Sequence, residues 1–419
     1  MINNISNKII SSIVLIYCLI PLALISGSFL PDLFLSLIGV FFLFYSIKYK
    51  LWNNYNHNFV FLFIGFYIYI LLRSLLSIDP VLSLEHSLFF FRYLFFILAT
   101  IFLIQNYDNF IKYFTISLFI TLICVILDAL VQFFFNYNTL GFENIGNHSL
   151  NGIFKDKEVL GIYLARLTPF SLGLLIFIMP KKNFNTLFYS VFLIISCTVV
   201  FLTGDRSETA LSIISCLIIF YSLKEFKNTK WISSILLILL ISISLFNSLE
   251  LKQKYIYNIS DKINDGHFIS WKHEAMLMSS FNMFKQNPIF GQGSKMFRVL
   301  CKDEKFIYNI PGRDVDETSH GCSNHPHNIY AEILAENGLI GFSFLTLIFL
   351  YFSFHLFKNF FFVILNKQSL HSSYEICILV TIFINLIPLV PSMGMFNNWA
   401  SVIFFLPFGF YFSRIKIKI

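Results

Sequence analysis

Long apolar runs recur along the whole of this chain, and they constrain its fold more than any other feature. About twelve segments approach the roughly 20 apolar residues that a helix needs to cross a bilayer. They lie near residues 9–27, 29–47, 58–76, 84–104, 111–136, 158–179, 184–203, 207–223, 231–247, 327–357, 373–391 and 394–413. The composition agrees, because 57% of the 419 residues are hydrophobic and mean hydropathy is +0.72. We therefore predict an all-α, polytopic integral membrane protein.

Basic residues in alternate short loops set the predicted orientation. They are Lys8, Lys48, Lys50, Lys112, Lys181, Lys182, Lys224, Lys227, Lys230, Lys358, Lys367, Arg414, Lys416 and Lys418. The positive-inside rule makes these loops and both termini cytoplasmic. The same loops account for the net charge of +7, so we expect no nucleic-acid partner. We expect no cleavable signal peptide, because the first apolar run continues into the next span.

One long hydrophilic segment, residues 248–326, lies on the opposite, outward face in this topology. It divides the chain into spans 1–9 (1–247), a loop subdomain (248–326) and spans 10–12 (327–419). Its stretch "EAMLMSSFNMFKQNPIFGQG" has a helical apolar pattern that should stop at Pro288 and the glycines. Cys301 and Cys322 share this segment, so we expect them to form a disulfide if it faces an oxidising compartment.

Three arginines lie in the outward half of the predicted bundle. Arg92 and Arg166 each lie about eight residues from the outer end of a span, roughly 12 Å deep, and Arg206 lies in the outer turn "TGDRSET". Ionisable residues inside spans are costly, so each is a candidate functional residue. The alternative is that each extends to the lipid headgroups or pairs with a nearby acid. The nearby acids are Asp128, Glu158, Asp205 and Glu208.

A histidine pair precedes the tenth span in "SNHPHNIYAEILAENGLIG". Pro326 suits the first position of a helix, which would put His327 in the first turn. The positive end of a helix disfavours an imidazolium, so we expect a neutral His327 that can accept a proton as a general base. The alternative is a histidine that satisfies a buried polar partner. We expect His325 to be the supporting member of the pair.

Metal and nucleotide chemistry have weaker support. His320, Cys322, His325 and His327 are close enough in sequence for a metal site, but a second set of ligands is missing and Cys301 is a plausible partner for Cys322. We therefore expect no metal. The chain has no phosphate loop followed by Lys-Ser/Thr, no GxSxG and no HExxH. It also has no evident repeat of broken helices, which weakens a transporter interpretation without excluding it.

Four segments resemble, in the same order, motifs of the O-antigen ligase and O-antigen polymerase superfamily. "NGIFKDKEVLGIYLARLTPF" resembles its segment ending in an arginine before a proline, and "LTGDRSETALS" resembles its outward Gly-acid-Arg turn. "FNMFKQNPIFGQGSKMFR" resembles its loop helix ending in Asn-Pro and Gly-x-Gly, and "HPHNIYAEILAENGLIG" its His-Asn pair followed by an acidic-Gly segment. The resemblance covers roughly residues 150–345, whereas the amino-terminal spans match only in general character.

The resemblance implies a glycosyltransferase that needs neither metal nor cofactor. Such an enzyme takes a glycan from undecaprenyl diphosphate on the periplasmic side of the bacterial inner membrane, among membrane lipids. A ligase transfers the glycan to lipid A-core. One large outer loop after about nine spans favours the ligase over the polymerase. The alternatives are a polymerase that joins lipid-linked repeat units, a protein O-oligosaccharyltransferase, or a transporter of lipid-linked substrates. Guanidinium groups could hold the leaving diphosphate in place of Mg²⁺.

The resemblance also implies residue roles. His327 matches the catalytic histidine, which would take the proton of the acceptor hydroxyl as it attacks the anomeric carbon, with inversion. Arg206 matches an arginine that grips the diphosphate. Arg166 resembles another basic position of the family, whereas Arg92 is assigned on its depth alone. His325 and Asn328 are expected in the substrate site because they flank His327.

One departure from the family concerns the long loop. The family has an arginine there, whereas the comparable stretch "GHFISWKHEAM" offers His267, Lys272 and His273. We expect His273 or Lys272 to make the substrate contact of the missing arginine.

Overall fold

The structure is a computed structural model that describes residues 2–143, 150–155, 157–179, 183–264, 270–310, 320–388 and 390–413. Within these ranges the chain is helical apart from loops and one isolated bridge between Tyr137 and Glu143. The all-α class predicted from the apolar runs is confirmed. Lys181, Lys182, Arg414, Lys416 and Lys418, used to predict orientation, lie outside the described ranges, as does His267.

The first half of the chain forms α1 (Ile2–Cys18), α2 (Ile20–Ser26), α3 (Phe29–Lys48), η1 (Trp52–Tyr55), α4 (Asn58–Leu75), α5 (Pro80–Ser87), η2 (Leu88–Phe90), α6 (Phe91–Asn106), α7 (Phe110–Phe135), η3 (Gly152–Phe154), α8 (Leu160–Ile178) and α9 (Asn183–Leu202). The second half forms α10 (Arg206–Ser222), η4 (Lys224–Phe226), α11 (Lys230–Asn247), α12 (Leu249–Lys252), the π-helix η5 (Gln253–Tyr257), α13 (Asn258–Asn264), α14 (Trp271–Gln286), α15 (Phe297–Leu300), α16 (Ile329–Ile364), α17 (Ser373–Leu386) and α18 (Asn398–Phe412).

Each predicted span coincides with a helix or a short series of helices. Among the described residues, eight helices are long and apolar enough to cross a membrane, or nine if α1 and α2, bent by 46°, form one span. The other three predicted spans correspond to α10, α17 and α18, which have 17, 14 and 15 residues. These helices are shorter than the roughly 20 residues of a full span. A total of twelve spans therefore remains a prediction.

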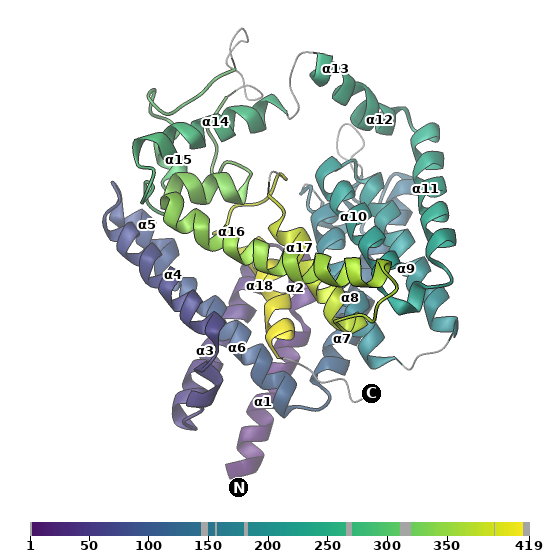
Figure 1. Cartoon of the computed structure of the whole chain (residues 1–419), viewed down its shortest axis with the longest axis horizontal. Helices are drawn as coiled ribbons and strands as arrows, with labels where there is room; N and C mark the ends of the chain where they lie inside the picture. The colour runs from purple at the N-terminus through teal and green to yellow at the C-terminus, as the bar shows by residue number, and fades with distance from the viewer. Residues whose placement is uncertain are drawn as a thin grey trace.

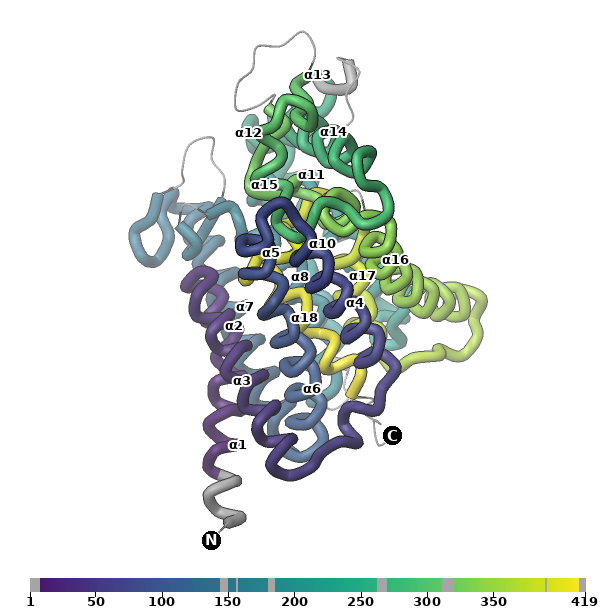
Figure 2. The backbone as a smooth tube through the Cα atoms, turned by 90° about the vertical axis from the view of Figure 1, so that its left-hand side faces the viewer, coloured from purple at the N-terminus to yellow at the C-terminus, as the bar shows by residue number. Residues whose placement is uncertain are grey.

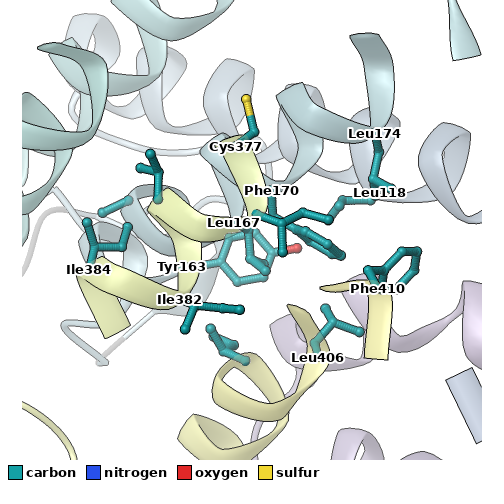
Figure 3. Close-up of a cluster of buried hydrophobic side chains, with 14 of the residues drawn as sticks. Leu118, Tyr163, Leu167, Phe170, Leu174, Cys377, Ile382, Ile384, Leu406 and Phe410 are labelled. Carbon is teal, nitrogen blue, oxygen red and sulfur yellow. The ribbon is translucent and has the colours of Figure 1, made fainter. Parts of the chain in front are cut away.

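The core of the bundle lies around α8. In this helix 78% of the residues of its span are buried, against 17% in α4 and in α11, so those two lie at the periphery. Gly173 of α8 lets this helix pack closely against α17, because a Cβ there would lie 2.7 Å from the Cβ of Cys377. Figure 3 shows this core, where the rings of Phe170 and Phe410 pack edge to face at 5.0 Å. Tightly packed helices position the polar residues described below.

The described residues of the 248–326 segment form a layer that contains α12 to α15. This layer lies at the opposite end of the bundle from α1, as both orthogonal views show (Figures 1 and 2). Ser270 is the N-cap of α14, and the helix ends at Gln286, before Pro288, as its apolar pattern predicts. Its packing against the first part of α16 joins the layer to the bundle.

A kink divides α16 into two limbs. Gly338 has φ 59° and ψ −162° inside this 36-residue helix, and the loop that follows α14 occupies the break. Gln292 N donates to Ala335 O at 3.0 Å, and Leu339 N donates to Pro288 O at 2.9 Å. These bonds replace helical hydrogen bonds that the kink removes. The first limb of α16 is thereby fixed to the 248–326 layer.

Candidate functional site

His327 lies just before α16 and not inside it. Asn328 is the N-cap, and its side chain accepts hydrogen bonds from Tyr330 N and Ala331 N at 3.0 Å each. The prediction that Pro326 opens the helix and puts His327 in its first turn is therefore wrong. An asparagine side chain satisfies two free N–H groups of the first turn, so the helix begins after it. His327 adopts φ 53°, an uncommon conformation for a residue other than glycine.

Three imidazoles meet at this position. The ring centroid of His327 lies 4.2 Å from that of His325 and 5.6 Å from that of His273 on α14. Ser270 Oγ forms a hydrogen bond with Nδ1 of His273. Helix α14 and the segment before α16 thus bring together three of the predicted site residues. Lys272, a fourth, is exposed and acts on His327 through its charge.

Both histidines of the pair are held in the neutral form. Burial, and then the charge of Lys272, lower the pKa of His327. Burial, followed by the charges of His327, Lys295 and Arg298, lowers the pKa of His325 to about 3. The lowered pKa of His327 agrees with the neutral imidazole expected from the sequence. Its cause is burial and the charge of Lys272, and not the positive end of a helix. A neutral His327 can accept a proton.

A loop between α17 and α18, residues 390–397, holds the histidine pair and is called the 390s loop below. Ser392 N donates to His327 O at 2.8 Å, and Asn328 Nδ2 donates to Val390 O at 3.2 Å. Gly394 lies against the pair, because a Cβ there would be 3.3 Å from the Cβ of His325. The 390s loop therefore fixes the backbone of the histidine pair relative to α17 and α18.

Arg166 lies on one side of the 390s loop. It lines a small cavity of about 40 Å³ together with Ile329, Asn385 and Ser392. Its guanidinium donates to Asn385 Oδ1 at 2.9 Å and pairs with Glu208 Oε1 at 2.8 Å. The acid pairing considered from the sequence thus holds for Arg166. Arg166 therefore lines the cavity with its charge compensated by Glu208, and the ion pair joins α8 to α10.

Arg206 is the first residue of α10 and is half-buried. Asp205 caps the helix by accepting from Ser207 N at 3.0 Å and Glu208 N at 3.2 Å. Within the described ranges, Arg206 has no hydrogen-bond or ion-pair partner. Lys254 extends over the same turn, because a Cβ on Gly204 would lie 2.7 Å from its Nζ. An unpaired guanidinium and an ammonium at a helix amino terminus favour an anionic ligand.

Arg92 lies on the other side of the 390s loop, in a second cleft of about 280 Å³. Arg92 Nη2 pairs with Asp32 Oδ1 at 2.8 Å and donates to Asn398 Oδ1 at 3.1 Å. Asp32 was not among the acids considered from the sequence. The cleft is lined by Glu85, His86, Phe89, Phe90, Arg92, Tyr93, Phe396 and Asn398. We call it the His86 cleft.

Two cations near this cleft were missed from the sequence. Lys295 is only 6% exposed, and its Nζ lies 5.7 Å from the centroid of the Phe396 ring. Arg298 Nε is sealed from solvent without a hydrogen-bond partner in the described part of the chain. Both lie in "GQGSKMFR", which the sequence analysis used only for its glycines. Arg298 is thus an arginine of the long loop, beside the histidine pair.

Two buried carboxylates of α16 bind the backbone of the loop after α14 and of the 390s loop. Glu336 accepts from Lys295 N at 2.7 Å and from Phe297 N at 3.0 Å, and Glu332 accepts from Met395 N at 2.6 Å. Glu336 thereby holds the loop that carries Lys295, and Glu332 holds the 390s loop. These acids of the "AEILAENG" motif position the site and do not form an open acidic cluster.

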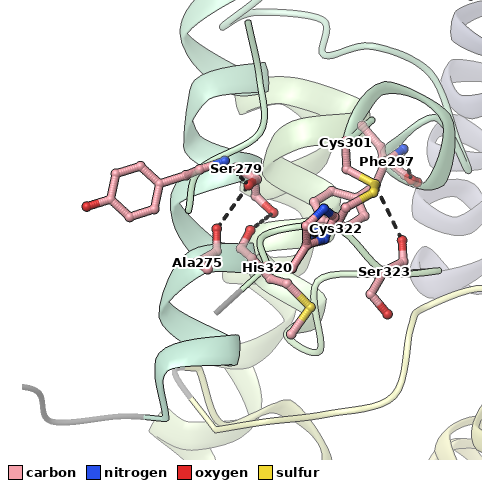
Figure 4. Close-up of a disulfide and its surroundings, with 11 residues drawn as sticks. Ala275, Ser279, Phe297, Cys301, His320, Cys322 and Ser323 are labelled. Atoms are coloured by element: carbon pink, nitrogen blue, oxygen red, sulfur yellow. Dashed lines mark hydrogen bonds between the residues drawn. A yellow bond between two sulfur atoms is a disulfide. The ribbon is translucent and has the colours of Figure 1, made fainter. Parts of the chain in front are cut away.

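Cys301 and Cys322 are joined by a disulfide with a Cα–Cα distance of 5.0 Å (Figure 4). The bond ties α15 to the segment that leads to the histidine pair. Cys322 is therefore not a free thiolate for the metal constellation considered from the sequence. Among the residues that the structure describes, no group of three or more His, Cys, Asp or Glu side chains is arranged to hold a metal ion.

In a comparison with protein families, residues 191–346 match the family described as O-antigen ligase. Comparison with curated proteins gives no match. The resemblance to the O-antigen ligase and polymerase superfamily is thereby confirmed for this stretch. The matched residues include Arg206, His273, Arg298 and the histidine pair. Arg92 and Arg166 lie outside it, so their assignment rests on geometry.

Proposed function

We propose that the chain is an O-antigen ligase-type glycosyltransferase, because residues 191–346 of this multi-pass membrane protein match the O-antigen ligase family. It moves a polysaccharide from undecaprenyl diphosphate to lipid A-core on the periplasmic side of the inner membrane. The observation that carries the proposal is the cluster of His327 with His325 and His273, in which burial lowers the pKa of His327 and the 390s loop holds its backbone.

His327 is the proposed general base. Its neutral ring takes the proton of an acceptor hydroxyl as the oxygen attacks the anomeric carbon of the donor sugar. The bond between that carbon and the diphosphate oxygen breaks, and its electron pair leaves with the lipid diphosphate. Attack opposite to the leaving group inverts the anomeric configuration. The imidazolium then releases its proton to solvent.

Arg206 is the proposed partner of the leaving diphosphate. Its guanidinium has no partner among the described side chains and lies at the amino terminus of α10, with Lys254 nearby. Charge-assisted hydrogen bonds to phosphate oxygens strengthen as negative charge grows on the leaving group. Arg166, already paired with Glu208, supports the same side of the site. His273, His325, Asn328 and Lys272 complete the binding surface around His327.

A polymerase that joins lipid-linked repeat units is the second candidate, because the matched family is compatible with either acceptor. The single large layer formed by residues 248–326 favours the ligase. The surface polysaccharide of a deletion strain separates the two. Full-length chains that accumulate on the lipid carrier indicate a ligase. Single repeat units transferred to core indicate a polymerase.

Complementation with His327→Ala tests the catalytic role. Loss of a general base lowers transfer by roughly 10²–10⁴-fold, while the lipid-linked donor still binds. A carrier of lipid-linked substrates would keep most of its flux in this variant. His355→Ala, on the second limb of α16 and away from the site, is the matched control.

A further inference from the structure

The loop that follows α14 lies beside α4 and not beyond its end. Tyr69 Oη of α4 donates to Asn337 O at 2.6 Å and, less closely, to Phe290 O at 3.1 Å. Tyr69 is six positions before Leu75, where α4 ends, so the backbone of Phe290 lies roughly 9 Å along the helix axis from that end. Helix α4 is long and apolar enough to cross a membrane. Residues 287–290, called the tip loop below, are therefore level with the interior of a span.

The tip loop presents large apolar side chains outward. Ile289 and Phe290 are each about half exposed. On α4, Ile68 and Leu72 flank Tyr69 and are exposed to a similar extent. The exposed side of a membrane span contacts acyl chains. The tip loop thus continues a surface of α4 that faces lipid.

The exposed apolar surface also extends beyond the tip loop, toward the 248–326 layer. Leu76, Ile78 and Val81 are 75%, 63% and 80% exposed. They lie in the turn after α4 and at the start of α5, on the far side of Leu75 from Tyr69 (Figures 1 and 2). Turns that face water are usually polar. The tip loop is therefore placed inside the apolar band of the molecule and not at its rim.

The backbone of the tip loop is paired in the way that hydrocarbon requires. Four consecutive carbonyl groups each accept a hydrogen bond. The acceptors are Asn287 O, Pro288 O, Ile289 O and Phe290 O, and their donors are Gly291 N, Leu339 N, Ile340 N and Tyr69 Oη. Pro288 also has no N–H to satisfy. An unpaired carbonyl is costly among acyl chains, whereas a loop in water has no need of such pairing.

We propose that the tip loop inserts into the acyl-chain region of the bilayer leaflet nearest the 248–326 layer, with phospholipid acyl chains as its partner. The loop then anchors a layer that is otherwise outside the bilayer. It also enters the kink of α16, and Glu336 binds the backbone that follows it at Lys295 and Phe297. The anchor therefore fixes the first limb of α16 relative to the lipid. This inference does not depend on the proposed transferase function.

Electron paramagnetic resonance of the full-length protein in lipid nanodiscs tests the depth of the tip loop. A nitroxide attached at Phe290→Cys collides with oxygen, which concentrates among acyl chains, and with a nickel chelate, which stays in water. Serine replaces Cys18 and Cys124, the free cysteines that are not buried. We expect the ratio of oxygen to nickel collisions to match that at Ile68→Cys on α4. It should exceed severalfold the ratio at Ser260→Cys, an exposed position of α13.

A charge in the tip loop should reverse the result. A carboxylate among acyl chains is costly, so Phe290→Asp should move the loop toward water. A nitroxide at Ile289→Cys should then lose its preference for oxygen, whereas the same label with Phe290→Leu should keep it.

Three outcomes would overturn the proposal. A label at position 290 that prefers nickel, as at Ser260→Cys, would place the tip loop in water. A label that neither reagent reaches would show that protein, such as a second copy of the chain, covers the loop. An unchanged collision ratio at Ile289→Cys in the Phe290→Asp protein would show that lipid does not hold the loop.

Discussion

Gly291 and Gly338 meet so closely at the kink of α16 that neither position has room for a side chain. A Cβ on Gly291 would lie 2.4 Å from the carbonyl carbon of Glu336, and a Cβ on Gly338 would lie 2.3 Å from Ile289 O. Both residues have positive φ, 73° and 59°. The Gly-x-Gly loop and the acidic-Gly segment are thus one structural unit that positions Lys295, Arg298 and the first limb of α16.

Gly291→Ala should therefore destabilise the protein by about 2 kcal/mol or more, through left-handed strain and the clash with α16. Thermal unfolding in lipid nanodiscs measures the effect. Gly65→Ala is the matched control, because a Cβ at this helical position would have no neighbour within 4 Å. That substitution should be neutral or slightly stabilising. Equal unfolding temperatures of the two variants would contradict the role assigned to the kink.

Lys272→Glu should move the acid limb of the pH–rate profile to higher pH. Lys272 helps to lower the pKa of His327, and a negative charge in its place favours the imidazolium and raises that pKa. More of the base is then protonated and inactive at mildly acidic pH. We expect a roughly two- to fivefold lower kcat/KM near pH 6, because Lys272 is exposed, and little change above pH 8. Lys285→Glu is the control. An unchanged profile in Lys272→Glu would separate Lys272 from the chemistry.

His325 should make the folded protein sensitive to acid. Its pKa is about 3 in the folded protein, against about 6.5 for an unperturbed histidine. A lowered pKa means that the unfolded state binds the proton first, so the stability from this residue is complete above pH 6.5. It is lost progressively as the pH falls toward 3. His325→Gln should flatten the stability curve between these values, whereas His355→Gln should not. Unfolding curves at several pH values measure the slope.

The positions of most helices could be predicted from the apolar runs, because helix length and helix ends depend on local sequence. Bilayer thickness fixes the length of an apolar helix, and a helix such as α14 ends near a proline wherever it lies. The three shorter helices α10, α17 and α18 show the limit of this rule, because a largely buried helix does not have to match the bilayer alone. The predicted position of His327 is wrong because Asn328, and not Pro326, sets the start of α16 by capping its first turn.

The partners of the charged residues could not be predicted from spacing. Arg92 pairs with Asp32, 60 positions earlier, because α3 and α6 pack side by side. The charge of Arg298 acts on His325 because the Gly-x-Gly loop enters the kink of α16. Such contacts depend on tertiary packing, and a single sequence carries no local signal for them.

Cys301→Ser should lower stability by about 3 kcal/mol, since the disulfide closes a loop of about 20 residues in the unfolded chain. The freed segment also leads to His325 and His327, so we expect transfer to fall as well. Alkylation of the non-reduced protein followed by mass spectrometry tests the pairing directly. Alkylation of both Cys301 and Cys322 under these conditions would rule out the bridge. Cys124→Ser, at an exposed position of α7, should leave stability and transfer unchanged.

Arg166 and Arg206 should respond differently to the same substitution. Arg166→Gln leaves Glu208, whose side chain is 3% exposed, without its cation, so it should cost about 3–5 kcal/mol of stability. Replacing both members, as Arg166→Leu with Glu208→Leu, should recover most of that loss, because no buried charge is then left unpaired. Arg206→Gln removes a guanidinium that has no partner among the described residues, so its unfolding temperature should match that of the parent.

Arg206, whose substitution should leave stability unchanged, should instead affect the rate of glycan transfer. Arg206→Gln should lower kcat/KM about hundredfold or more, if its guanidinium stabilises the charge of the leaving diphosphate. Arg206→Lys should recover only part of the rate, because an ammonium cannot bind two phosphate oxygens in a planar fork. An Arg206→Gln protein that transfers glycan at the parental rate would remove this residue from the mechanism. An equal loss of stability in Arg206→Gln and Arg166→Gln would show that Arg206 has a structural role instead.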